Sequence, residues 1–278
     1  MGLNQKQFLI GGESSFSHLS EAFWSGDNPG EGEHSGSVDI SALNLFAGYG
    51  FSNLINLYFN LPFKRISQTP DEENNHHRTE KLTGIGDVRF SLKWIIRNQY
   101  IGPGWRLFIG SDINLPTGKQ YELNPFAETA DSVEHRHFAL GTGASSAEVS
   151  LEAWHRSEFP FILGVTIKQG VYSSVSEVGY DPGLRTNISL HAIRQRGFLR
   201  KAYPYFKLSL RVQGKDEWSG VTAPNSGGSF IDGMFGLNLE LGNDVSGVLN
   251  FDFPVWESAV DEQLEAFRIA LSLRRVFN

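Results

Sequence analysis

Four histidines in two neighbouring polar segments are the first candidates for chemistry in this sequence: His76, His77, His135 and His137. Imidazole nitrogen binds zinc and copper well, and acidic residues flank both segments. His135 and His137 are two residues apart, so both could face the same way from an extended chain. The sequence therefore allows a metal site shared by two loops. The plainer interpretation is that polar loops contain histidines, since no tight ligand spacing marks a site.

Two combinations of serine and histidine raise the alternative of a hydrolytic enzyme. Ser189 and His191 would share one face of an extended segment, and His155 and Ser157 would meet in a turn. A serine nucleophile needs an oriented base, and no recognised motif ties an asparagine or aspartate to either pair. We therefore expect no enzyme, with a lipid-modifying activity as a secondary alternative.

Charged residues recur at every second position of many segments. Arg89 and Lys93 alternate with the apolar Phe90, Leu92 and Trp94, as side chains on opposite faces of a strand do. If the apolar faces contact lipid, the polar faces line a lumen. The predicted pore-lining set is Arg89, Lys93, Arg106, Asp112, Asn114, Arg185, His191, Lys207, Arg211, Glu240, Asp252, Arg268 and Arg274.

This lining set has two interpretations, which are compatible with each other. Arginine and lysine side chains around a narrow lumen would favour solutes with anionic groups. Charges of both signs could also pair across the lumen and brace the barrel. A barrel of twelve strands lies between the filled interior of about eight strands and the aqueous channel of about sixteen.

The elements that position these residues are strands that are long for a soluble protein. Most span about 10–14 residues, whereas a strand that crosses a bilayer needs roughly 9–11 and soluble strands average about 5–6. The predicted strands lie near 5–20, 37–49, 54–65, 84–97, 104–116, 137–154, 159–172, 184–195, 203–213, 229–241, 245–256 and 264–277.

Short and long connections alternate between these strands. The longer ones are 21–36, 66–83, 117–136, 173–183, 214–228 and 257–263. Bacterial outer-membrane barrels have an even strand number, short periplasmic turns and long external loops. The pattern therefore predicts an all-β, transmembrane, up-and-down antiparallel barrel that occupies 1–278 as a single domain.

Composition limits the other classes of protein. The net charge of -7 argues against a nucleic-acid partner, and the lack of cysteine excludes a disulfide scaffold. No run of about 18 apolar residues marks a transmembrane helix.

The first residues lack the apolar region of a signal peptide, so we expect a mature form. Aromatic residues near the strand ends, and an alternating C-terminal segment that finishes at Phe277-Asn278, are typical of outer-membrane barrels.

Three motifs resemble a known family of outer-membrane β-barrel transporters, the meta-pathway phenol-degradation type. They are Gly84-Ile85-Gly86-Asp87 followed by a strand with Lys93, then Leu115-Pro116-Thr117-Gly118, then Leu140-Gly141-Thr142-Gly143. Their order and spacing fit that family over about 38–170, whereas Ala144-Ser145-Ser146 departs from its pattern. The resemblance implies a barrel that passes small, often apolar or aromatic, solutes. The glycines themselves suggest a bulge or a close backbone approach.

The sequence therefore predicts an outer-membrane channel, or solute-binding barrel, for passive uptake of a small solute. The alternatives are a zinc or copper protein that uses the loop histidines, a structural barrel, and a lipid-modifying enzyme. We expect no cofactor and no nucleic acid. The expected partners are outer-membrane lipid and lipopolysaccharide, around a monomer.

Overall fold

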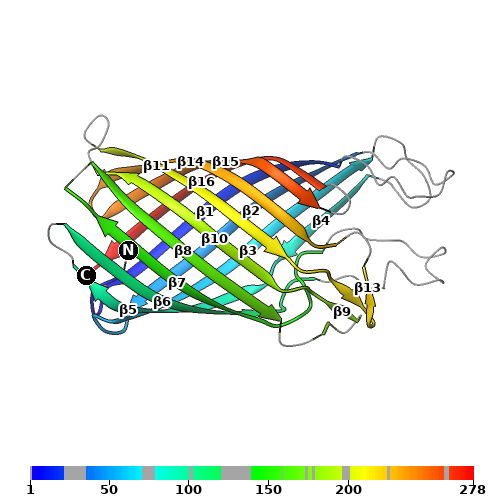
Figure 1. The fold of residues 1–278 in the computed structure, drawn as a ribbon, viewed down its shortest axis with the longest axis horizontal. Helices are drawn as coiled ribbons and strands as arrows, with labels where there is room; N and C mark the ends of the chain where they lie inside the picture. The colour runs from blue at the N-terminus through cyan, green and yellow to red at the C-terminus, as the bar shows by residue number, and fades with distance from the viewer. Residues whose placement is uncertain are drawn as a thin grey trace.

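The chain forms a closed barrel of antiparallel strands (Figure 1). This computed structural model describes residues 2–21, 36–70, 79–99, 103–119, 139–158, 160–172, 175–176, 179–195, 201–223, 226–259 and 263–278. The barrel segments are β1 (Phe8–Glu21), β2 (Gly36–Gly50), β3 (Ile55–Pro70), β4 (Glu80–Ile85), β5 (Val88–Asn98), β6 (Gly104–Leu115), β7 (Ser146–Arg156), β8 (Phe161–Tyr172), β10 (Arg185–Arg194), β11 (Ala202–Gln213), β14 (Gly228–Gly242), β15 (Val245–Ala259) and β16 (Gln263–Phe277).

Pairing between the first and last strands closes the barrel. β1 pairs with both β2 and β16, and β2 pairs with β3. β4 and β5 follow each other along β3 and together make one barrel strand, so the barrel has 12 strands. The predicted up-and-down barrel is confirmed. None of the described segments forms a helix of the length and apolarity that a bilayer crossing requires.

The outer wall carries the apolar side chains. Val149 and Leu151 of β7, and Leu163 and Ile167 of β8, are exposed there, and the other strands repeat this pattern. Exposed apolar surface on this scale would make a protein aggregate in water, whereas lipid covers it at no cost. The alternation in the sequence therefore identified the lipid-facing side of the wall.

Connections differ between the two ends of the barrel. The short connections 51–54 and 243–244 join strands at the end that carries both termini, which we call the terminal end (Figure 1). The longer connections, such as 22–35 and 116–145, join strands at the opposite end, which we call the loop end. The expected long loop at 257–263 is mostly strand, because β15 continues to Ala259 and β16 begins at Gln263.

One predicted strand is broken. We expected continuous pairing over 84–97, but Gly86 and Asp87 separate β4 from β5. The backbone N–H of Gly86 donates to the carbonyl oxygen of Pro62 at 2.8 Å. β4 also begins at Glu80, within a segment that we expected to be loop, and pairs with β3 alone.

The expected strand over 137–154 is also corrected. β7 begins at Ser146, and the described residues 139–145 before it are not strand. Gly143 has a φ of 68°, which ends any extended conformation there. Leu140, which lies within that expected strand, is 2% exposed and packs against Gly84.

A small second sheet lies beyond the loop end, in segments expected to be loop. It consists of β9 (Tyr180–Asp181), β12 (Glu217–Trp218) and β13 (Val221–Thr222). Trp218 is buried against Tyr180, with ring centroids 4.8 Å apart. The Tyr180 hydroxyl donates to Asp216 at 2.9 Å, and the Gly183 amide donates to the same carboxylate at 2.8 Å. These contacts order two connections against each other.

Replacing Tyr180 with phenylalanine is expected to loosen this small sheet. A hydrogen bond to a carboxylate contributes about 2 kcal/mol, so amide exchange at Gly183 and Ser219 should accelerate about tenfold or more. Burial, together with Asp216, raises the pKa of the Tyr180 phenol. The folded chain therefore holds this proton more tightly, and the stabilisation is lost as the pH rises above about 10. Hydrogen exchange measures both effects, and Tyr203→Phe at the terminal end is the control.

Candidate functional site

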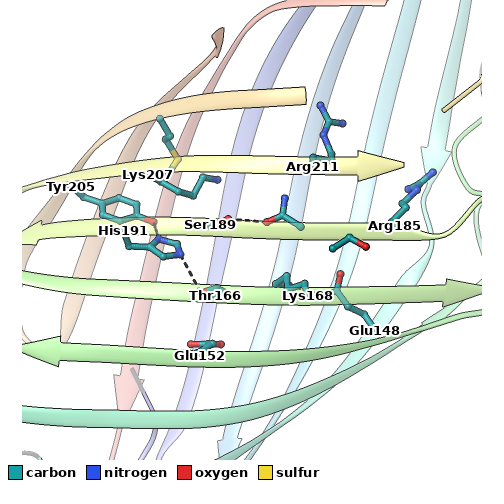
Figure 2. A pocket seen from close by; sticks show the side chains of 13 residues that line it. Glu148, Glu152, Thr166, Lys168, Arg185, Ser189, His191, Tyr205, Lys207 and Arg211 are labelled. Atoms are coloured by element: carbon teal, nitrogen blue, oxygen red, sulfur yellow. Dashed lines mark hydrogen bonds and ion pairs between the residues drawn. The ribbon is translucent and has the colours of Figure 1, made fainter. Parts of the chain in front are cut away.

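A cavity lies inside the barrel, against the wall formed by β7, β8, β10, β11 and β14 (Figure 2). Its volume is about 540 Å³. Four predicted lining residues border it: Arg185, His191, Lys207 and Arg211. Two more, Asp252 and Arg268, border a smaller cavity of about 120 Å³ next to it. Because inward positions alternate with the apolar outward ones, neighbouring strands bring these side chains together.

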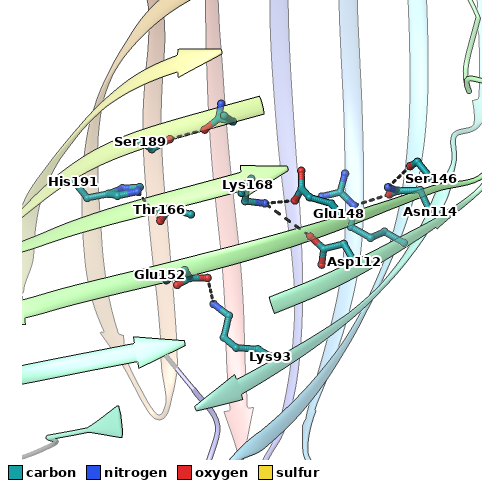
Figure 3. Close-up of polar contacts among 12 residues, drawn as sticks. Lys93, Asp112, Asn114, Ser146, Glu148, Glu152, Thr166, Lys168, Ser189 and His191 are labelled. Carbon is teal, nitrogen blue, oxygen red and sulfur yellow. Dashed lines mark hydrogen bonds and ion pairs between the residues drawn. The ribbon is translucent and has the colours of Figure 1, made fainter. Parts of the chain in front are cut away.

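Ion pairs along the inner wall join adjacent strands or strands separated by one other (Figure 3). The Lys93 ammonium lies 2.7 Å from Glu152, and the Lys168 ammonium lies 2.6 Å from Glu148 and 3.8 Å from Asp112. A second set joins the strands near the smaller cavity: Lys207 with Asp252 at 4.0 Å, Arg211 with Asp232 at 3.6 Å, and Arg268 with Glu13 at 2.9 Å and Asp252 at 3.8 Å. The predicted bracing role thus has a geometric basis.

His191 is held by an uncharged network toward the terminal end of the cavity. Its Nδ1 lies 2.6 Å from the Tyr205 hydroxyl, and its Nε2 lies 3.1 Å from Thr166 Oγ1. The Trp154 ring packs on the imidazole with centroids 4.8 Å apart. These contacts fix the ring, and Figure 2 shows His191 between Tyr205 and Thr166 on the cavity wall.

The remaining predicted lining residues lie elsewhere along the barrel, toward its loop end or its terminal end. Arg89 Nε donates to Asn114 Oδ1 at 2.8 Å, toward the loop end of the wall. Arg106 pairs in register with Trp154. Near the terminal end, Arg274 donates to Ser246 at 2.9 Å, and Glu240 is hydrogen-bonded to Tyr203. In the structure, the predicted residues are therefore distributed along the length of the barrel. Whether all of them line a conducting pore stays a prediction.

The N-terminal segment before β1 packs into the terminal end of the barrel. The Leu3 amide donates to Asn56 Oδ1 at 2.8 Å, and Asn56 Nδ2 donates to the Leu3 carbonyl at 3.0 Å. Asn56 is 0% exposed and Leu3 is 7% exposed. Gly2 lies against Ile95, and Gly48 lies against Leu3. We call this packed segment, residues 2–7, the floor of the barrel. It was not predicted, because nothing in its sequence marks where it packs.

The side chains of both serine–histidine pairs contact other residues. Ser189 Oγ donates to Asn187 at 2.8 Å and is hydrogen-bonded to Ser209, while His191 contacts Thr166 and Tyr205. The His155 ring packs on Trp105 with centroids 4.7 Å apart, and Ser157 Oγ donates to the Phe161 carbonyl. Neither pair has the hydrogen bond that would activate a serine nucleophile.

The four histidines of the metal hypothesis, His76, His77, His135 and His137, lie outside the described residues. Among the residues that the structure does describe, no three histidine, aspartate or glutamate side chains form a group that could hold a metal ion. The metal hypothesis therefore stays a prediction.

Glu148 and Glu152 are site residues that the predicted set omitted. Both border the cavity, and each pairs with a lysine. They alternate with Val149 and Leu151, so the period of two could have identified them. Tyr205 could be assigned to the interior in the same way, but its contact with His191 depends on the tertiary arrangement.

The three motifs of the sequence resemblance meet around one carboxylate. Asp87 accepts hydrogen bonds from the Gly118 amide at 3.0 Å and from the Thr142 amide at 2.9 Å. Thr117 Oγ1 donates to the Gly86 carbonyl at 2.8 Å. A side chain at Gly118 would collide with the backbone of Gly141, 2.7 Å away. The glycines therefore allow the close backbone approach that the sequence suggested.

These features define the class of the protein. A closed barrel with an apolar outer face, a charged interior and strands long enough to span a bilayer is a transmembrane β-barrel of the outer-membrane type. The chain is all-β throughout its described residues, and its cavity lies inside the ring of strands.

Comparison with known proteins supports this class through fold alone. No protein-family model matches the sequence, and no curated protein matches it. An outer-membrane channel from Pseudomonas putida F1 superposes with a TM-score of 0.75 and 13% identity, covering 99% of this chain and 97% of that one. The β domain of the Bordetella autotransporter Brka gives a TM-score of 0.57 at 12% identity, covering 97% and 99%.

A third solved structure, the NanC porin, has a TM-score of 0.52 at 8% identity and covers 96% of this chain and 98% of its own. These likenesses establish a shared fold of outer-membrane barrels that includes channels and porins. The resemblance to the phenol-degradation transporter family stays a prediction, because such distant likenesses do not define a family.

Proposed function

We propose that the protein is a monomeric channel in a bacterial outer membrane and passes a small solute passively through its lumen. In this orientation the terminal end faces the periplasm, the loop end faces outward, and lipid and lipopolysaccharide surround the wall. The observation that carries the proposal is a cavity with charged walls inside a closed barrel whose outer face is apolar. Similar folds among solved outer-membrane channels support it.

The lining of the cavity favours a solute that is small and partly apolar. The charged side chains are mostly paired with one another, which reduces the field they exert on a passing ion. Toward the periplasmic end, Trp154, His191 and Tyr205 present aromatic surface. Such a lumen would hold a compact solute with one polar or charged group better than a large hydrophilic one.

A bulky substitution in the cavity tests this proposal. Asn187 borders both cavities, so Asn187→Trp should lower the single-channel conductance in planar bilayers by about half or more, because a twelve-stranded lumen has little room. Leu190 lies on the same strand and is exposed on the outer face. Leu190→Trp is therefore the matched control and should leave the conductance unchanged.

The unmodified protein provides the first result. Refolded barrels should give discrete conductance steps in potassium chloride and should admit small solutes in a liposome-swelling assay. A correctly folded barrel with neither conductance nor solute flux would contradict the proposal and favour a purely structural barrel.

A further inference from the structure

Five inward residues form a row across adjacent strands at the outward side of the cavity. Arg89 pairs in register with Asn114, Asn114 with Ser146, and Ser146 with Tyr172. Arg185 pairs with Gly170 on β8, so it is a diagonal neighbour of Tyr172. The row therefore begins with one guanidinium on β5 and ends with another on β10. We call these five residues the polar row.

Contacts within the polar row hold its polar groups in place. Arg89 Nε donates to Asn114 Oδ1 at 2.8 Å, and Asn114 Nδ2 donates to Ser146 Oγ at 2.8 Å (Figure 3). At the other end, the guanidinium of Arg185 lies over the Tyr172 ring, 5.5 Å from its centroid.

The two arginines of the polar row differ in their partners from the cations of the cavity wall. Four others each lie within 4.0 Å of a carboxylate: Lys93 near Glu152, Lys168 near Glu148, Lys207 near Asp252 and Arg211 near Asp232. Within the described residues, Arg89 and Arg185 contact only an asparagine and a tyrosine. Each guanidinium therefore keeps most of its five N–H donors for another acceptor.

Among the described residues, four carboxylates lie near the row, and each is already engaged. Asp112 and Glu148 lie one inward position from Asn114 and Ser146, and both pair with Lys168. Asp87 accepts from the Gly118 and Thr142 amides, and Asp216 accepts from Tyr180 and the Gly183 amide. Backbone hydrogen bonds hold the Asp87 and Asp216 carboxylates in position, and Lys168 holds the other two. The positive charge at both ends of the polar row is thus left for a ligand.

We infer that the polar row is a recognition site for the carboxylate or sulfonate group of a small organic anion that enters from outside. Guanidinium groups bind such planar or branched oxyanions through paired N–H donors. The adjoining cavity of about 540 Å³, with Tyr205 and His191 deeper in it, has room for an apolar or aromatic body. This inference rests on the proposed channel function and names the class of solute.

Equilibrium binding tests the site without requiring that the channel conduct. The full chain in detergent is titrated calorimetrically with benzenesulfonate and with phenyltrimethylammonium, which present the same ring with opposite permanent charges. Benzenesulfonate should bind and the cation should not. Arg89→Gln and Arg185→Gln should each weaken benzenesulfonate binding about tenfold, the usual effect of losing a charge-assisted hydrogen bond.

A matched arginine outside the lumen provides the control. Arg65 lies on the outer face of β3, exposed, in register with Ser41 and Thr83 of its neighbours, so Arg65→Gln removes the same charge without altering the row. It should leave the affinity unchanged. Equal binding of both probes, or unchanged benzenesulfonate affinity in both row variants, would overturn the inference. Conductance in potassium chloride, recorded on the same protein, separates this outcome from failure of the channel itself.

Discussion

Asn56→Ala is expected to open the periplasmic end of the barrel and raise the single-channel conductance about twofold or more, because a packed constriction is removed from the path. The substitution deletes both hydrogen bonds that hold the Leu3 backbone. Leu3 would then have a buried N–H and C=O without partners, which costs about 2–3 kcal/mol for the pair. Burying the Leu3 side chain stabilises the packed state by a comparable free energy. The N-terminal segment should therefore leave its position inside the barrel.

The natural absence of cysteine allows a direct measurement of this displacement. A single Leu3→Cys substitution should react slowly with a membrane-impermeant thiol reagent, and rapidly once Asn56→Ala is added. Asn60→Ala is the matched control, since Asn60 lies two inward positions further along β3 and pairs with Arg89 rather than with the N-terminal segment. Unchanged conductance and unchanged thiol reactivity in Asn56→Ala would show that other contacts hold the floor.

Most of the wall could be predicted from the sequence because each strand encodes its own orientation. Alternation over segments such as 202–213 assigns Phe206 and Leu208 to lipid and Lys207 and Arg211 to the interior, without knowledge of the neighbouring strands. Length and connection pattern then select a membrane barrel, since a soluble sheet would bury one face against a second layer.

Features that depend on distant contacts could not be predicted in this way. Gly84, Gly86 and Asp87 fit the start of a strand, whereas the break between β4 and β5 depends on partners that lie 31 and 55 residues further along the chain. Leu140 lies within the expected strand over 137–154, yet the structure places it outside β7, buried under Gly84. The floor at Leu3 and the polar row likewise exist only once the ring is closed.

Asp87→Ala is expected to have the largest effect on the stability of the outward half of the barrel. β6 ends at Leu115 and β7 begins at Ser146, so β4 has no strand beside it on that side within the described residues. The segments around Gly118 and Thr142 are attached there through the Asp87 carboxylate. Losing these bonds should cost about 2 kcal/mol locally and accelerate amide exchange at Gly118 and Thr142 about thirtyfold.

Two further variants separate the role of the carboxylate from general disturbance. Asp87→Asn keeps one acceptor oxygen, whereas its NH₂ group cannot accept a hydrogen bond. One of the two amides should therefore stay protected from exchange, and the other should exchange faster. Asp39→Ala removes a carboxylate that pairs with His18 at 2.7 Å on β1 and β2, and it should leave both amides protected. Wild-type exchange at Gly118 and Thr142 in Asp87→Ala would mean that the contacts of Lys64 and Leu140 with their neighbours suffice to hold this part of the wall.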